Sequence, residues 1–214
     1  MNTSSLSQLP GYRFNEYLLV LQPNEDLRER IMKIKEAFSG KYKAPAQFSQ
    51  PHITLANFIQ FEMREERLVN RLQTIAMGYH AFKVELRDYG SFPSHTIFIN
   101  VESKQQVQNL GKELRGARQI MTLNKDNKPH FINEPHLTIA RKLLPWQYEQ
   151  GWLEYSNRNF TGRFIADSML LLKRRIGEKN IEKDAGRPFV KYQIVRRFDF
   201  MNLPVATTQG ELFV

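Results

Sequence analysis

Two histidines and two threonines in a repeated six-residue stretch are the residues of this sequence best suited to catalytic chemistry. Residues 51–56 read PHITLA and residues 135–140 read PHLTIA, so the two copies differ only by Leu/Ile exchanges. The histidines, His52 and His136, stand 84 positions apart. Copying of a supersecondary unit explains such a match better than coincidence does. The sequence therefore predicts a duplicated fold with two equivalent histidines.

The chemistry that such a pair favours is phosphoryl transfer. Imidazole titrates near neutral pH, so one ring can accept a proton while the other donates one. In-line transfer needs a base at one oxygen and an acid at the leaving oxygen on the far side. The hydroxyls of Thr54 and Thr138 can hydrogen-bond the non-bridging phosphate oxygens. This scheme calls for no metal and no cofactor.

The element that positions each pair must be a strand. Side chains alternate across a strand, so His52 and Thr54 share one face while Ile53 and Leu55 point to the other. A single histidine in such a strand is more often structural than catalytic. The second copy has the same parity, and two polar faces backed by apolar ones predict two strands that line one cleft.

The rest of the chain alternates between predicted helices and predicted strands. Helical spacing of apolar residues predicts helices over 25–38, ended by Ser39-Gly40, and over 62–77, 103–117 and 145–152, the third opened by a Ser103/Gln106 capping box. Strand patterns cover 17–21, 82–86, 96–101, 160–175 and 189–200, with a turn at 89–93 and a loop at 122–134.

This order predicts an α+β protein with a duplicated, bilobal α/β fold. We expect two antiparallel-rich sheets that flank a central cleft, with the helices outside. No linker separates the lobes, so residues 15–202 are expected to form a single domain. Residues 1–14 are expected to be a flexible N-terminus and residues 203–214 a C-terminal tail.

Composition narrows the class of protein. The chain has 31 Lys and Arg against 22 Asp and Glu, which gives a net charge of +9, and it has no cysteine. Disulfides, thiolate metal sites and a cysteine nucleophile are therefore excluded, while a basic chain attracts polyanions. No apolar run is long enough to span a bilayer, and no signal sequence is evident. We expect a soluble, cytoplasmic monomer without membrane contact.

The paired His-x-Thr-x motifs on a duplicated chain of this length resemble the 2H phosphoesterase superfamily, and within it the LigT-like 2′-5′ RNA ligase and cyclic phosphodiesterase family. The resemblance implies metal-independent hydrolysis of 2′,3′-cyclic phosphates, on RNA ends or nucleotides, to 2′-phosphomonoesters, with possible reversible 2′-5′ ligation. It also implies that His52 and His136 are catalytic and that Thr54 and Thr138 bind phosphate. By family convention the first histidine donates the proton, and the roles exchange with the direction of the reaction.

Further residues are candidates for substrate binding. Arg141 follows the second motif and could clamp a phosphate, although its odd offset from His136 puts it on the opposite strand face. Phe92 and Tyr89 could deliver an aromatic ring to a base from the turn at 89–93, or Phe92 could simply close the core.

The segment 173–197 holds nine Lys or Arg against three Asp or Glu. This predicted hairpin is either an RNA-tracking surface or a solvated one.

Two other functions compete with this hypothesis. A nucleotide or RNA binding module could keep the same cleft without useful catalysis, although binding alone needs no acid and base. A histidine-metal hydrolase is disfavoured, because His80, His95 and His130 show no metal-ligand spacing. Of these three, His130 is the one to inspect again, since it lies in the loop before the second motif.

Overall fold

The computed structural model describes residues 11–44, 50–93, 95–176 and 191–203. Most of the expected N-terminal segment and nearly all of the expected C-terminal tail lie outside these residues. The expected domain limits therefore stay predictions.

The described strands form one antiparallel sheet. They are β1 (Phe14–Leu21), β2 (Ile53–Phe61), β3 (Phe82–Phe92), β4 (Thr96–Val101), β5 (His130–Phe131), β6 (His136–Arg141), β7 (Thr161–Ala166), β8 (Ser168–Arg175) and β9 (Gln193–Asp199). Their order is β7-β3-β4-β6-β2-β1-β8-β9, and β5 pairs with β2 beside β6. Every one of these pairings is antiparallel.

The sheet consists of two halves joined at one point. Strands β7, β3, β4 and β6 make one half, and β2, β1, β8 and β9 make the other. A single residue pair, Ile53 with Leu137, connects them across β2 and β6. The α+β class is confirmed, and the two sheets expected from the sequence are the halves of one sheet whose junction lies between the two copies of the motif.

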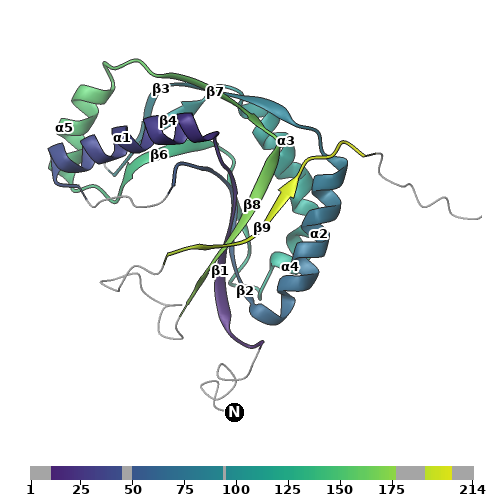
Figure 1. Cartoon of the computed structure of the whole chain (residues 1–214). Coiled ribbons are helices and arrows are strands. Elements are labelled where there is room, and N and C mark those ends of the chain that lie inside the picture. The colour runs from purple at the N-terminus through teal and green to yellow at the C-terminus, as the bar shows by residue number, and fades with distance from the viewer. Residues whose placement is uncertain (1–10, 45–49, 94, 177–190, 204–214) are drawn as a thin grey trace, which may run out of the picture.

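The helices are α1 (Glu25–Tyr42), α2 (Glu65–Gly78), α3 (Lys104–Leu114), α4 (Arg118–Met121) and α5 (Pro145–Tyr155), with short 3₁₀ turns at Glu62–Arg64 and Arg115–Ala117. Helices α2, α3 and α4 lie along one side of β1, β2, β8 and β9, whereas α1 and α5 lie beside β4 and β6 (Figure 1). None of the described helices combines the length and apolar character needed to cross a bilayer.

Helices α1 and α5 approach each other closely on their half of the sheet. A Cβ on Gly151 would lie 2.7 Å from Cζ of Phe38 and 3.3 Å from Cδ1 of Ile97, so only glycine leaves room for the Phe38 ring. That ring also packs edge-on against Tyr155, with centroids 5.2 Å apart. This packing holds α5, which lies on β4, against α1, which lies on β6.

The prediction of a turn at 89–93 was wrong, because Tyr89 to Phe92 belong to β3. Gly90 lies within this strand, and its missing side chain makes room for a neighbour: a Cβ there would lie 2.5 Å from Cε2 of Phe98. The irregularity that does occur is a β-bulge at Asp88, whose φ is 51°. The glycine therefore serves close packing rather than chain reversal.

Three smaller expectations also differ from the structure. Helix α1 continues through Gly40, because Tyr42 is buried and packs on Phe38 with centroids 4.7 Å apart. Ser103 does not cap α3, since its hydroxyl accepts a hydrogen bond from the Glu85 N–H at 2.9 Å. The expected strand over 160–175 divides into β7 and β8 around Asp167.

Candidate active site

The two copies of the motif have the same burial pattern. In each, the proline is buried, the histidine and threonine are half-buried, and the aliphatic residues are buried. His52 immediately precedes β2, and His136 is the first residue of β6. The alternation expected from the sequence is confirmed. We call the sheet face that carries His52, Thr54, His136 and Thr138 the motif face.

Antiparallel pairing brings the two copies together. Ile53 lies opposite Leu137, and in an antiparallel register one step forward on one strand is one step back on the other. His52 therefore comes opposite Thr138, and Thr54 opposite His136. A local twofold relation through the Ile53–Leu137 pair thus relates the two His-Thr pairs.

Both imidazoles are held in the same orientation by the backbone. Nδ1 of His52 lies 2.7 Å from the carbonyl oxygen of Gln50, and Nδ1 of His136 lies 2.8 Å from that of Glu134. A carbonyl only accepts, so each Nδ1 carries the hydrogen in these bonds. Nε2 is then the nitrogen of each ring that can exchange a proton with a substrate.

Aromatic side chains support the second histidine. The rings of Phe92 and Phe98 lie 5.0 Å and 4.9 Å from the His136 ring, measured between centroids. They also contact each other, at 4.7 Å. The structure therefore places Phe92 beside His136 and against Phe98.

Arg141 lies on the motif face, although its odd offset from His136 predicts the opposite strand face. Two consecutive residues of β4, Ile97 and Phe98, pair with Ala140 and Thr138. The residue between those two, Ile139, is thus the extra residue of a β-bulge, which shifts the alternation by one position. The strand face of Arg141 is thereby the face of His136.

Tyr89 is not brought together with the motif residues. It pairs with Ile99 on the opposite face and packs edge-on against Tyr155 of α5, with centroids 4.9 Å apart. Its ring also contacts Phe160. The structure thus gives Tyr89 a packing role beneath α5.

Lys35 of α1 is a site residue that sequence reasoning missed. Its side chain is only 4% exposed, and it is close enough to His52 and Arg141 for their charges to interact. Burial, and then the charge of Arg141, lowers the pKa of Lys35 to about 8. The sequence feature that indicates its burial is its position one turn after Ile31, on the buried stripe of the helix.

The two histidines differ in their electrostatic surroundings. Burial lowers the pKa of His52, and the charges of Lys35, Arg141 and His136 lower it further against the opposing Gln50 hydrogen bond. Burial also lowers the pKa of His136, but the hydrogen bond to Glu134 and the carboxylate of that residue oppose the shift. The two rings therefore differ in the charges around them: cations surround His52, and a carboxylate lies beside His136.

The other parts of the chain singled out by sequence lie elsewhere. His80 and His95 are exposed, and within the described ranges no group of three His, Cys, Asp or Glu side chains could hold a metal ion. In the basic segment 173–197, Lys173 pairs with Glu65 at 2.8 Å and Arg197 with Asp167 at 3.2 Å. Residues 177–190 of that segment lie outside the description.

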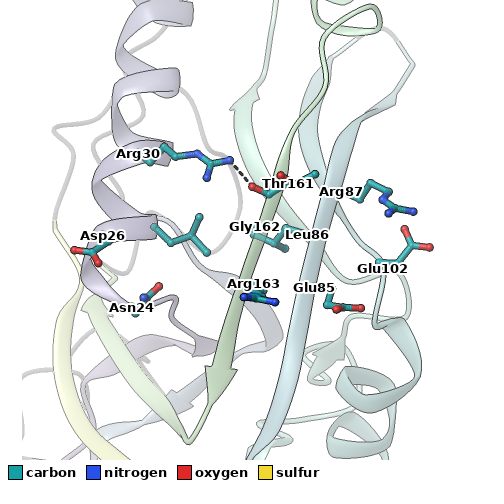
Figure 2. Close-up of a pocket in the computed structure, with 11 residues that line it drawn as sticks. Asn24, Asp26, Arg30, Glu85, Leu86, Arg87, Glu102, Thr161, Gly162 and Arg163 are labelled. Atoms are coloured by element: carbon teal, nitrogen blue, oxygen red, sulfur yellow. Dashed lines mark hydrogen bonds between the residues drawn. The ribbon is translucent and has the colours of Figure 1, made fainter.

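A groove of about 630 Å³ lies apart from the motif residues (Figure 2). It is lined by the start of α1 and by residues of β3 and β7, and charges of both signs border it. Arg30 spans the groove to donate a hydrogen bond to the Thr161 carbonyl (Figure 2). None of the four motif residues lines it.

The chain resembles known proteins in both sequence and fold. A family model described as the 2′-5′ RNA ligase superfamily matches residues 23–178. The chain belongs to this superfamily. The resemblance to 2H phosphoesterases drawn from the two motifs is thereby confirmed.

Sequence relatives and solved structures agree with this membership. A relative from Geobacillus kaustophilus, named for phosphoesterase activity, is 26% identical over 125 residues, covering 56% of this chain and 68% of its own. One from Bacillus cereus is 26% identical over 130 residues, covering 58% and 69%. The crystal structure of E. coli LigT with 3′-AMP has a TM-score of 0.58 at 14% identity, covering 87% of this chain and 98% of LigT. These relatives indicate a phosphoesterase-class enzyme with the LigT-like fold.

Proposed function

We propose that this superfamily member hydrolyses nucleoside 2′,3′-cyclic phosphates, on RNA ends or small nucleotides, to 2′-phosphomonoesters by histidine acid-base catalysis. The observation that carries the proposal is the Ile53–Leu137 pair, which sets two His-Thr pairs around one point of the motif face. Both rings keep Nδ1 on a backbone carbonyl. Two Nε2 atoms are therefore available for one substrate.

In this reaction a water molecule attacks phosphorus from the side opposite the 3′ oxygen. The neutral imidazole accepts the proton of the water at Nε2 as the new P–O bond forms. The protonated imidazole donates its Nε2 proton to the 3′ oxygen as the P–O3′ bond breaks. The products are a 2′-phosphomonoester and a free 3′ hydroxyl, and the proton has passed from one ring to the other. The same step with a ribose 5′ hydroxyl in place of water would form a 2′-5′ bond, and its reverse, attack of the 3′ hydroxyl with loss of the 5′ hydroxyl, would restore the cyclic phosphate.

Negative charge on the phosphate is balanced by neighbouring groups in this scheme. The hydroxyls of Thr54 and Thr138 donate to the non-bridging oxygens, because each lies on the motif face opposite a histidine. Arg141 and Lys35 supply positive charge beside His52. Charge-assisted hydrogen bonds of this kind are about twice as strong as neutral ones.

Nucleotide binding by structural neighbours supports the choice of substrate. LigT from E. coli has been crystallised with 3′-AMP, with ATP and with NADP⁺. These three ligands share a ribose and a phosphate, which are the groups that two His-Thr pairs and an arginine are suited to bind. We therefore expect this chain to accept a nucleotide phosphate at the motif face.

The test is hydrolysis of a nucleoside 2′,3′-cyclic phosphate in excess chelator, with the product identified by phosphorus NMR. The protein should turn over and yield the 2′-phosphomonoester, and the H52A/H136A double variant should retain only the background rate. His80→Ala, an exposed histidine away from the motif face, serves as the matched control and should keep wild-type activity. Equal rates in wild type and double variant would refute the proposal, and tight binding without turnover would favour a binding module.

A further inference from the structure

The first copy of the motif contains the same kind of β-bulge as the second. Two consecutive residues of β1 pair with Thr54 and Ala56, so Leu55 is the extra residue of β2. Leu55 and Ala56 are both buried, and Asn57 is half-buried. The bulge thus turns Asn57 back to the face of Thr54, as the other bulge does for Arg141.

A line of side chains crosses the sheet from Asn57. Residues directly opposite each other in antiparallel strands point to the same face. The strand registers join one residue from each of five neighbouring strands. In order from β5 to β9 this cross-strand row consists of His130, Asn57, Leu18, Leu172 and Ile194. The row therefore lies on the motif face, beside Thr54.

The two ends of the cross-strand row are accessible from solvent, whereas Leu18 at its centre is buried. His130 is exposed, Asn57 and Leu172 are half-buried, and Ile194 is 68% exposed. Four strand spacings of about 4.8 Å make the row about 19 Å long. Its polar end is next to the motif and its apolar end is at the edge of the sheet. Such a surface is longer than a mononucleotide bound at the histidines requires.

An arginine and a tyrosine flank the outer part of the row. Arg174 lies opposite Glu16 and pairs with it, and its guanidinium lies 5.0 Å from the centroid of the Tyr192 ring. Tyr192 comes just before β9, two residues from Ile194. The charge of Arg141 also acts on Tyr192, so these two side chains approach each other from the two halves of the sheet.

The sheet surface on the β6 side of the motif is more obstructed by side chains. On the half of the sheet that contains β6, the rings of Phe92 and Phe98 pack against His136. A chain attached to a bound phosphate would meet these rings on that side. Across β1, β8 and β9 it would meet the buried Leu18, the half-buried Leu172 and the exposed Ile194 instead.

We propose that the cross-strand row binds the nucleotides that precede the cyclic phosphate of a single-stranded RNA end. This inference rests on the proposed function, since it assumes that the phosphate sits at the two histidines. A terminal cyclic phosphate has chain on its 5′ side only, and one row beside Thr54 is enough to hold it. His130 and Asn57 hydrogen-bond the sugar and phosphate of the adjoining nucleotide, and the bases pack on Leu172 and Ile194. Tyr192, with the Arg174 guanidinium over its ring, flanks this outer part of the row.

The first experiment compares a nucleoside 2′,3′-cyclic phosphate with a tetraribonucleotide that ends in the same group. Wild type should show the larger kcat/KM on the tetranucleotide. Ile194→Ser should lower that value by about tenfold, the effect expected when the apolar contact of one large aliphatic side chain is lost, and should leave the mononucleotide unchanged. Ile165→Ser is the matched control, because Ile165 is equally apolar, 59% exposed and on the far edge strand β7.

The second experiment measures binding without turnover, by fluorescence anisotropy of a labelled tetranucleotide ending in a 2′-phosphate. The I194S and H130A variants should bind about tenfold more weakly than wild type, whereas I165S and H80A should bind as wild type does. If wild type hydrolyses the cyclic phosphate but all variants bind equally, the inference is overturned and the proposed function stands. If binding depends on the row but no hydrolysis occurs, the row is supported and the proposed function fails.

Discussion

Replacing Gly90 by alanine tests how the second histidine is supported. A Cβ at this position would lie 2.5 Å from Cε2 of Phe98 and 2.6 Å from Oδ1 of Asn100. Neither distance is compatible with a carbon contact, so the Phe98 ring has to move. That ring packs against His136 with centroids 4.9 Å apart. We therefore expect the variant to be less stable and less active.

The expected loss of stability is about 1–3 kcal/mol, the usual cost of an added methyl group in a packed core. Urea denaturation followed by circular dichroism measures it as a lower midpoint at an unchanged slope. Steady-state kinetics on a nucleoside 2′,3′-cyclic phosphate should show a reduced kcat, because the imidazole of His136 loses its fixed aromatic neighbour.

The matched control is Gly40→Ala. Gly40 lies inside α1 with nothing within 4 Å of its Cβ position, so alanine there should stabilise the protein by about 0.4–1 kcal/mol and leave kcat unchanged. A double variant, Gly90→Ala with Phe98→Leu, should recover part of the lost stability, because the clashing ring is gone. The reasoning is refuted if Gly90→Ala unfolds at the wild-type urea concentration.

Three further predictions concern the charges and donors of the site. The active form has one protonated and one neutral imidazole, so activity is lost below the lower pKa, where both rings are charged, and above the higher pKa, where both are neutral. Both pKa values are lowered from 6.5, and the maximum of kcat/KM against pH should lie below 6.5; a maximum above pH 7 would contradict this. Lys35→Met should raise the pKa of His52 in an NMR titration, whereas Lys33→Met on the exposed side of α1 should not, and an unchanged His52 titration would argue against the role of Lys35. Thr54→Val and Thr138→Val should each lower kcat/KM by about tenfold to a hundredfold, the effect of one hydrogen bond to a charged group, and wild-type kinetics in both would exclude phosphate binding by these hydroxyls.

The repeat made the centre of the site predictable from sequence. Proline, histidine and threonine at matched positions indicated two strands with polar faces, and both strands have the expected alternation. The α+β class followed from the order of helical and strand patterns. These features depend on local periodicity, which a single sequence displays.

Features set by pairing between distant segments were not predictable. The bulge that turns Arg141 to the motif face depends on how β6 pairs with β4, and the two-residue strand β5 exists only because it pairs with β2. A glycine between Tyr89 and Ser91 predicts a turn, because nothing nearby in sequence indicates the Phe98 ring that Gly90 accommodates. Lys35 was overlooked because a lysine on an apolar stripe is usually assigned to solvent, and its burial depends on the fit of α1 over β6.

The central claim is that His52 and His136 act together on one phosphate, and a double-mutant cycle tests it most directly. We would measure kcat/KM on a nucleoside 2′,3′-cyclic phosphate for wild type, His52→Gln, His136→Gln and the double variant. Each single substitution should lower the rate by about 10²–10⁴, and the double variant should be little worse than either, because two groups that act as one unit are not additive. Single variants that each keep the wild-type rate would contradict the claim.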